Sequence, residues 1–284
     1  MISVVIPVLN GAATIGEQLE ALREQAPGVD CEVVVADNGS TDDTRAVVAR
    51  FTDALPGLRV VDASARKGPA AARNIGAEAA SGDVLAFCDA DDVVAPGWLA
   101  AVEKATEEHD FMAGSLDFHF FRPPVPGAER SSNWAPTVGN FRWLKYGLGA
   151  NMAVSRRAFN EVGGFSEEMK TGEDIDLSWR LQLAGHPLYH EPEAVVYKRP
   201  RPSSRHKARQ HFIYGQYDVV LYKRLRSRGM PRRSLVAQAK LYGWLVLNAW
   251  RLVADERGRS TWLIAGSSAL GRVTGSVRHR TLFL

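Results

Sequence analysis

Short apolar segments alternate with amphipathic segments through the first third of the chain. Runs rich in β-branched residues predict four strands, at residues 2–7, 32–36, 58–61 and 83–88. Helical spacing of apolar positions, or a proline at the start, predicts helices at residues 14–24, 41–51, 69–80 and 96–106. Strands that are apolar on both faces and separated by helices are typical of a parallel sheet covered on both sides. The pattern predicts an α/β fold in which ligands bind at the carboxyl ends of the strands.

The rest of the chain falls into an irregular middle and a helical end. In the middle we expect strands at residues 110–121, 149–154, 188–190 and 194–197, and helices at residues 155–162 and 173–183. Residues 122–136 are rich in proline, glycine and serine, which predicts a loop. Helical patterns follow at residues 206–228, 234–254 and 260–277. We therefore expect one domain at residues 1–200 and a basic helical extension at 201–284.

Charge is distributed unevenly along the 284 residues. The net charge of +3 conceals 19 Lys and Arg against 3 Asp and Glu in residues 198–284, and 16 against 29 in the remainder. An acidic body joined to a basic end favours an anionic partner for that end, such as phospholipid, a phosphorylated lipid carrier or nucleic acid. The alternative is a solvated helical surface that pairs with the chain's own acidic body. With 45% hydrophobic residues, the chain as a whole is not a disordered protein.

Compartment and membrane signals are few. Cys31 and Cys88 border apolar runs, which predicts buried small hydrophobes in a reducing compartment. The N-terminus has no basic region before its short apolar run, so we expect no signal peptide. No uncharged apolar stretch reaches the roughly 18 residues that span a bilayer. We therefore expect a soluble or peripheral protein.

A polar segment, DNGSTDD at residues 37–43, follows the second predicted strand. Its Ser, Thr and Asp content suits a helix-capping turn. Asp37, however, precedes the cap at the strand end, where its carboxylate could accept an N–H of a nucleobase. Pro7, Val8 and Asn10 end the first strand beside it.

An acidic segment, Asp89 to Asp92, follows the fourth predicted strand. Three carboxylates within four residues repel one another unless a cation or donor group offsets them. Asp89 and Asp91 would point to the same side of an extended chain and offer two hard oxygens to Mg²⁺ or Mn²⁺ bound with a diphosphate. An acidic loop without metal is the alternative.

Two further segments carry charge at predicted helix starts. In KGPAAARN, residues 67–74, Arg73 lies one turn into the helix, where it could reach a diphosphate or fix an aspartate; a plain surface helix is the alternative. In GEDID, residues 172–176, acids open a helix after a glycine. The helix dipole by itself favours acids there, but a base placed over a substrate hydroxyl is the sharper hypothesis.

Taken together and in order, six segments resemble a family 2 glycosyltransferase with the GT-A fold. They are SVVIPVLN (3–10), DNGSTD (37–42), GPAAARNIG (68–76), FCDADD (87–92), NMAV (151–154) with GGF (163–165), and GEDIDLSWR (172–180). Each alone is a weak signal, but six in the family's order are a strong one. The resemblance covers about residues 2–200, and the last third has no motif that can be carried over.

The resemblance implies an inverting transfer from a nucleoside-diphosphate sugar. Asp37 would match the family aspartate that holds the nucleobase, usually uracil, and Arg73 the basic residue near the diphosphate. Asp89 and Asp91 would form the family's DxD motif, which holds the ribose and a divalent cation, Mn²⁺ or Mg²⁺. Asp174 would be the catalytic base, with Glu173 as the second candidate.

The same resemblance implies a wider donor site. Its expected members besides those above are Pro7, Val8, Asn10, Asn38, Lys67, Ala90 and Lys198. On the acceptor side, Asp176 would orient the helix start or bind acceptor. Trp179 would be an acceptor platform or a helix-packing residue.

The sequence departs from the family at two points. The family often has a histidine where VYKRPR, residues 196–201, offers Lys198. A protonated lysine cannot ligate a cation, so Lys198 would contact the diphosphate directly, and His190 is an alternative ligand. The Gln-x-x-Arg-Trp motif of processive synthases is absent, which favours addition of a single sugar.

The basic end carries Trp244, Trp250 and Trp262 among Leu, Tyr and Arg, a mixture that suits a membrane interface. We expect it to dock on the inner, cytoplasmic face of the membrane and to present a lipid-linked or cell-envelope acceptor to Asp174. The alternatives are packing on the catalytic body or a homodimer. No recognised module predicts nucleic-acid binding.

Other functions are weighed against the leading one. A nucleotidyltransferase would need a basic glycine-rich loop after the first strand, and residues 8–13 (VLNGAA) hold no Lys or Arg. A non-catalytic sugar-nucleotide-binding or scaffold protein, and a glycosyltransferase acting on a natural product, stay as alternatives.

Overall fold

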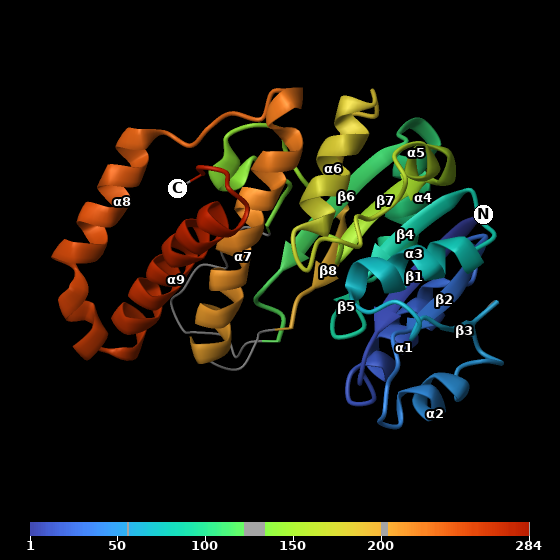
Figure 1. Cartoon of the computed structure of the whole chain (residues 1–284). Coiled ribbons are helices and arrows are strands. Elements are labelled where there is room, and N and C mark those ends of the chain that lie inside the picture. Colours follow the sequence, from blue (N-terminus) through green and yellow to red (C-terminus); the bar gives the residue numbers. More distant parts are fainter. Residues whose placement is uncertain (56, 122–133, 200–203, 284) are drawn as a thin grey trace. The chain divides into compact units, whose positions relative to one another are not determined.

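Figure 1 shows the computed structural model of the chain, which describes residues 1–55, 57–121, 134–199 and 204–283. The predicted loop at 122–136 therefore lies largely outside the described residues. The chain divides into two compact units. The first comprises Met1–Val138 and Leu144–Pro200, and the second Gly139–Trp143 and Arg201–Leu284.

The first unit is built on a sheet of eight described strands in the order β3-β2-β1-β4-β7-β6-β8-β5. The strands are β1 (Ile2–Val8), β2 (Cys31–Asp37), β3 (Arg59–Asp62), β4 (Val84–Cys88), β5 (Val93–Val94), β6 (Phe111–Asp117), β7 (Asn151–Ser155) and β8 (Tyr189–Tyr197). β3, β2, β1 and β4 are parallel, β7 runs antiparallel to both of its neighbours, β8 is parallel to β6, and β5 is antiparallel to β8. The predicted α/β fold is confirmed, with a mixed sheet.

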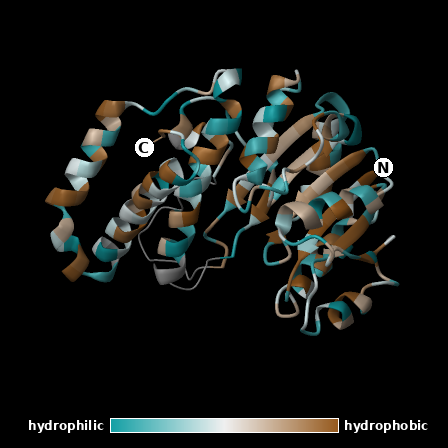
Figure 2. Ribbon diagram, viewed as in Figure 1, coloured by the Kyte–Doolittle hydropathy of each residue, from teal (hydrophilic) through white to brown (hydrophobic). Residues whose placement is uncertain are grey.

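Helices cover both faces of this sheet. They are α1 (Ile15–Gln25), α2 (Thr44–Ala49) and α4 (Trp98–Glu108) on one face, and α3 (Pro69–Ala79), α5 (Arg156–Glu161) and α6 (Glu173–Leu183) on the other. The alternation of β1 decides the faces, because Val4 and Ile6 pack against Leu19 of α1, whereas Val5 packs with Ala77 of α3. Figure 2 shows these strands as hydrophobic, as expected for a sheet buried on both sides.

Two strand predictions needed correction. Residues 188–190 and 194–197 were expected as separate strands but form the single strand β8, because a register shift between Gly114 and Ser115 of β6 absorbs the irregularity around Pro192. The two-residue strand β5 was not predicted. It pairs Val93 with Tyr197 and so places the acidic segment before β5 opposite the residue after β8.

Close packing of α3 on the sheet brings its N-terminal half to the carboxyl ends of the strands. A Cβ added at Gly76 would lie 2.5 Å from Val5 Cγ1, so this helix needs glycine at its contact with β1. At the same edge, the register pairs Val8 of β1 with Asp37 of β2. β4 lies on the other side of β1 and ends at Cys88, one residue before Asp89. The ends of these three neighbouring strands form the predicted ligand edge.

The described part of the second unit contains α7 (Ser204–Leu225), α8 (Leu235–Leu247) and α9 (Glu256–Arg278), with short 3₁₀ helices η2 (Arg226–Arg228) and η3 (Ala249–Val253). α7 and α9 pack tightly, because a Cβ at Gly215 would lie 2.2 Å from the Ser268 carbonyl oxygen and one at Gly271 would lie 2.1 Å from that of Phe212. A helix long and apolar enough to cross a bilayer does not occur among the described residues.

Candidate active site

Arg73 of α3 is the centre of a buried ion network in the first unit. Its side chain is 6% exposed and donates hydrogen bonds from Nη2 to Asp89 Oδ1 at 2.7 Å and from Nη1 to Glu173 Oε1 at 2.9 Å. One guanidinium thus joins the segment after β4 to the first turn of α6. Of the two roles that the sequence left open for Arg73, fixing an aspartate is the one seen here.

Lys198 lies on the other side of Asp89. Its Nζ donates to Asp89 Oδ2 at 2.9 Å and also bonds the Asp92 carboxylate. The antiparallel pairing of Val93 with Tyr197 explains this contact, since Asp92 precedes one partner and Lys198 follows the other. Burial would raise the pKa of Asp89, but Lys198 and Arg73 hold it well below its usual range. Burial opposes the charge of Lys198, yet Asp89 and Asp92 raise its pKa, so the ammonium stays protonated.

The three aspartates that follow β4 differ in their surroundings. Ligand oxygens of Asp89, Asp91 and Asp92 lie within 4.8 Å of one another. Asp92 is buried, and this burial raises its pKa to about 6 despite Lys198. Asp91 is exposed, and within the described residues its carboxylate has no hydrogen-bond or ion-pair partner. Asp91 is therefore the aspartate of the three with oxygens available to a ligand.

This donor set fits a hard divalent cation. Five carboxylates, those of Asp89, Asp91, Asp92, Glu173 and Asp174, gather around the two cations Arg73 and Lys198. All candidate ligand atoms are oxygens, which suit Mg²⁺ or Mn²⁺, and such ions often take one or two carboxylates plus substrate phosphates. Because Lys198 and Arg73 already occupy both oxygens of Asp89, Asp91 is the best placed ligand. His190, the alternative ligand, lies elsewhere, with Nε2 3.1 Å from Ser115 Oγ.

Asp174 stands at the start of α6, directly after Glu173. Gly172 precedes the helix in the left-handed region, with φ of 74°, and turns the chain into it. Asp174 Oδ2 accepts a hydrogen bond from the Gly149 amide at 3.1 Å. Burial and the negative charge of Glu173 raise the pKa of Asp174 to about 6. A carboxylate of this basicity is suited to accept a proton near neutral pH.

Glycine at position 149 allows the backbone to contact both Arg73 and Asp174. A Cβ at Gly149 would lie 3.0 Å from Arg73 Cζ, closer than ordinary van der Waals contact. Gly149 therefore contributes its amide to Asp174 and its lack of a side chain to Arg73. Gly149 is not among the site residues predicted from the sequence, because no local sequence pattern indicates its role.

Asp176, Trp179 and Arg180 hold α6 in position. Asp176 is fully buried and accepts a hydrogen bond from Arg180 Nε at 2.7 Å, while Arg180 also donates to the carbonyls of Val162 and Gly164. Trp179 is fully buried too, and its indole N–H donates to the Leu144 carbonyl at 3.0 Å. Of the two roles considered for Trp179, helix packing is the one seen here, because its ring is packed in the interior.

Asp37 lies fully buried at the end of β2. It accepts a hydrogen bond from the Ser40 amide at 2.8 Å and another from Arg45 Nε. Burial would raise its pKa, but the Ser40 and Arg45 hydrogen bonds keep it low. Arg45 is a site residue that sequence reasoning missed. Its place in the first turn of α2, the helix that follows Asp37, was the available signal.

Neighbours of Asp37 hold the loop in place. Asn38 donates to the carbonyls of Ala63 and Arg66 at 2.6 and 2.7 Å and accepts from the Gly68 amide at 2.9 Å, so its side chain ties β2 to the start of α3. Asn10, at a φ of 54°, accepts from the Thr41 amide at 2.8 Å. Pro7 and Val8 pair with Ala36 and Asp37 in the sheet, and Ala90 is buried between Asp89 and Asp91.

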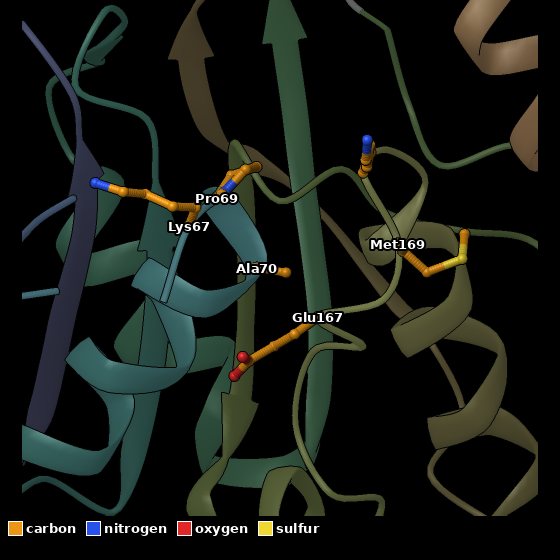
Figure 3. Close-up of a pocket in the computed structure, with 7 residues that line it drawn as sticks. Lys67, Pro69, Ala70, Glu167 and Met169 are labelled. Carbon is orange, nitrogen blue, oxygen red and sulfur yellow. The ribbon is translucent and has the colours of Figure 1, made fainter. Parts of the chain in front are cut away.

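Lys67 extends toward the Asp37 loop. Its Nζ would lie 3.1 Å from a Cβ at Gly39. Figure 3 shows the Lys67 side chain pointing away from Met169, at one side of a shallow cavity of about 250 Å³. The cavity is lined by Lys67, Gly68, Pro69, Ala70, Glu167, Met169 and Lys170. The predicted residues thus form two groups at the carboxyl edge, one around Asp37 and one around Asp89 and Asp174.

Comparison with known proteins decides the family. The model described as Glycosyl transferase family 2 matches residues 3–162, more than half of the chain. The chain belongs to this family. A second model, Glycosyl transferase family group 2, matches residues 85–267 and reaches into the second unit. The resemblance drawn from the six segments is confirmed.

Curated relatives of this family 2 chain carry diverse names. It is 28% identical to the pre-mycofactocin glycosyltransferase of Mycobacterium tuberculosis over 87% of its own length and 52% of the relative's. It is 29% identical to the succinoglycan biosynthesis protein ExoA of Rhizobium meliloti, over 80% and 71%, and 31% identical to the validoxylamine A glucosyltransferase of Streptomyces hygroscopicus, over 66% and 53%. The chain spans about half the length of several of these relatives.

Solved structures show the GT-A fold. The mannosyltransferase PcManGT of Pyrobaculum calidifontis, in complex with GDP-Man and Mn²⁺, matches with a TM-score of 0.64 and 21% identity, over 96% of this chain and 86% of that one. TarS 1-349 of S. aureus, in complex with UDP-GlcNAc, matches with a TM-score of 0.59 and 20% identity, over 100% and 93%. At these identities the likeness concerns the fold alone.

Proposed function

We propose that this chain is an inverting glycosyltransferase. It moves one sugar from a nucleoside-diphosphate sugar, UDP-linked, to a hydroxyl of a cell-envelope or lipid-linked glycan. The observation that carries the proposal is Asp174, whose pKa of about 6 makes it a proton acceptor beside the cationic network of Arg73 and Lys198. Family membership and the names of relatives such as ExoA support the class of acceptor.

The proposed reaction is a single displacement. Asp174 accepts the proton of the acceptor hydroxyl while the acceptor oxygen forms a bond to the anomeric carbon. The bond from that carbon to the diphosphate oxygen breaks, and its electron pair leaves with the nucleoside diphosphate. The sugar is inverted because attack comes from the face opposite the leaving group. Glu173 is a weaker candidate for the base, since Arg73 holds its carboxylate.

Cations on the leaving-group side offset the charge of the diphosphate. Lys198 stays protonated and lies between Asp89 and Asp92, where it can approach a phosphate oxygen. A divalent ion, Mg²⁺ or Mn²⁺ held by Asp91 and Asp89, would supply further positive charge to the leaving group. The PcManGT structure with Mn²⁺ is in keeping with this assignment.

Donor recognition is assigned to the group around Asp37. Asp37 would accept an N–H of the nucleobase once Arg45 moves aside, because in this structure its carboxylate is fully buried and bonded to Ser40 and Arg45. Pro7, Val8, Asn10 and Asn38 would shape the loop. Lys67 would contact the donor from the segment before α3. The free, buried cysteines are in keeping with a reducing, cytoplasmic location for this reaction.

The deciding experiment measures nucleoside-diphosphate release from a panel of sugar nucleotides, with Mn²⁺, with Mg²⁺ and with a chelator. We expect slow hydrolysis of one UDP-sugar, lost in Asp174→Asn and in Asp91→Ala. Asp83→Asn is the matched control, because this exposed carboxylate lies before β4, at the end of that strand opposite Asp89.

Each contrary outcome has its own meaning. Full turnover in the presence of chelator would show that the reaction needs no divalent metal. Lys198 would then be the group that offsets the charge of the diphosphate. Tight nucleotide binding with no release, even after addition of membrane extract, would contradict the proposed activity and favour a binding protein. Transfer to a soluble natural product and not to membrane extract would overturn the proposed acceptor class.

A further inference from the structure

Helix α8 exposes more apolar side chains than an ordinary surface helix does. Among residues 235–247, all of them described, Gln238 is the one buried side chain. Leu235, Val236, Val246 and Leu247 are 78%, 65%, 76% and 79% exposed. A surface helix of a water-soluble domain places its apolar side chains inward and its polar ones outward. Leu241, Trp244 and Leu245 of α8 are half-buried, so its inner side is apolar as well. The additional exposed apolar side chains indicate that the outer side of α8 also faces something apolar.

The exposed apolar surface continues past the end of α8. Trp250 and Val253 of η3 are 62% and 90% exposed. We call these six side chains, Leu235, Val236, Val246, Leu247, Trp250 and Val253, the α8 outer surface. In Figure 2 hydrophobic residues colour much of this helix. An apolar surface of this extent is a marker of an interaction site.

The sequence on both sides of α8 is rich in positive charge. Residues 219–254 contain eight Lys and Arg and no Asp or Glu. The exposed cations among them are Lys223, Arg224, Arg226, Arg228, Arg232 and Lys240. Arg251 lies 5.5 Å from the ring centroid of Trp250, which places a cation beside the exposed aromatic residue. The partner of this surface must therefore be apolar and anionic together.

We propose that the α8 outer surface docks on an anionic lipid bilayer. The apolar side chains enter the boundary between headgroups and acyl chains, and the cations contact headgroup phosphates. Thirteen helical residues are about 20 Å long, short of the roughly 30 Å hydrocarbon core, so α8 lies along the surface and does not cross it. Trp250 suits this depth because tryptophan favours the membrane–water interface.

Charge favours a bilayer over a second copy of the chain. Two α8 outer surfaces placed face to face would bring Lys240 of α8 and Arg251 of η3 from each chain together, and these like charges would repel one another. An anionic bilayer offsets the same cations and takes up the apolar side chains. This inference is independent of the proposed catalytic function, because it concerns binding alone.

The test is flotation of the full chain with vesicles of phosphatidylcholine, with and without phosphatidylglycerol. We expect binding to the anionic vesicles that weakens at high salt. The double variant Val246→Gln/Leu247→Gln should bind about tenfold or more weakly, since it removes two apolar side chains from the contact. Arg226→Gln/Arg228→Gln should lose affinity for anionic vesicles and show a shallower dependence on salt.

Matched controls separate docking from general effects. Leu183→Gln removes an exposed leucine at the end of α6, and Arg50→Gln/Lys104→Gln removes two exposed cations of the first unit. These variants should bind vesicles like the unchanged chain. All variants should keep donor hydrolysis, which shows that they are folded and that loss of binding is not loss of the proposed activity.

Two results would overturn the proposal. One is equal binding of the double glutamine variant and the unchanged chain to anionic vesicles. The other is absence of vesicle binding together with a dimer in sedimentation equilibrium that the double variant loses. The second result would assign the α8 outer surface to another copy of the chain.

Discussion

Helices α6 and α8 differ in the burial of their apolar side chains. α6 buries Leu177, Trp179 and Leu181 and places Glu173 and Asp174 at its start. α8 buries Gln238, keeps Leu241 and Leu245 half-buried, and leaves Leu235, Val236, Val246 and Leu247 exposed. Burial holds the carboxylates of α6 at fixed positions, whereas nothing in the second unit covers the outer side of α8 among the described residues. The first arrangement suits chemistry, and the second suits docking.

The two helices also differ in the charge around them. The start of α6 brings Glu173 to Arg73, and the aspartates after β4 pair with Arg73 and Lys198, so both buried cations are paired. The region of α8 gathers cations without acids. Charges paired inside a protein are expensive to separate, while exposed like charges stay available to an outside partner. The following substitutions test this contrast, beginning with the largest expected effect.

Removing the proposed base should have the largest effect on activity. Asp174→Asn keeps the size of the side chain but cannot accept the proton of the acceptor. We expect kcat to fall about 10²- to 10⁴-fold, with little change in donor affinity. Steady-state kinetics with the donor identified above would measure it. Loss of the same size in Asp83→Asn would show a general defect and not a catalytic one.

Breaking the buried network should have the largest effect on stability. Arg73→Met leaves Glu173 buried without its cation, which should lower the free energy of unfolding by about 3–5 kcal/mol. Urea denaturation measures this change. Arg66→Met is the control, because Arg66 pairs with Glu78 and Glu167 at the surface and should cost about 0–1 kcal/mol. Equal losses of unfolding free energy in the two variants would contradict the claim that the buried network contributes more to stability than a surface ion pair.

A pair of leucine substitutions compares the helices directly. Leu177→Ala in α6 creates a cavity in the interior and should lower the free energy of unfolding by about 2–5 kcal/mol. Leu247→Ala in α8 removes an exposed side chain and should change it by no more than about 0.5 kcal/mol without lipid. A large loss for Leu247→Ala in solution would mean that a protein surface already covers α8.

Gly149→Ala tests the fit of Arg73 against Asp174. The added methyl would press on the guanidinium, which must move by a few tenths of an ångström. We expect kcat to fall by about tenfold with a smaller effect on stability, because a small misplacement of catalytic groups reduces rate strongly. Gly185→Ala, at a glycine with open space around it and a φ of 98°, controls for backbone strain alone. An unchanged kcat in Gly149→Ala would show that the Arg73 guanidinium can move aside without affecting catalysis.

Lowering the pH should have the smallest effect on activity, and this effect should increase gradually. Asp174 acts as a base only when ionised, and its pKa is raised to about 6. We therefore expect kcat/KM to be constant above neutral pH, to be halved near pH 6 and to fall about tenfold for each further unit. A profile that stays flat down to pH 5 would contradict this assignment.

Much of the fold followed from local patterns. Apolar β-branched runs predicted β1, β2, β3 and β4, and a glycine followed by acids predicted α6 at Glu173–Leu183. Because ligands bind at the carboxyl ends of parallel strands, Asp37 and Asp89 were predicted to lie at the same edge of the sheet. These inferences succeeded because they depend on spacing and on the direction of parallel strands, both of which are written in the order of residues.

Other features depend on contacts between distant segments. Arg73 meets Glu173 across 100 residues, and Lys198 meets Asp89 across 109. Trp179 is a packing residue and Asn38 a loop tie because of what surrounds them in space. The two-residue strand β5 is too short to leave a periodic pattern, yet it sets Lys198 opposite Asp92.

The sequence alone determined the α/β class, the family and the residues that carry charge, because periodicity, motif order and composition are local properties. The tertiary structure alone decided which charges are paired, which carboxylates have a raised pKa and which helix leaves apolar side chains exposed. These depend on burial and on distances between groups far apart in the chain. Both the strength of an ion pair and the pKa of a group change with the surroundings that folding creates.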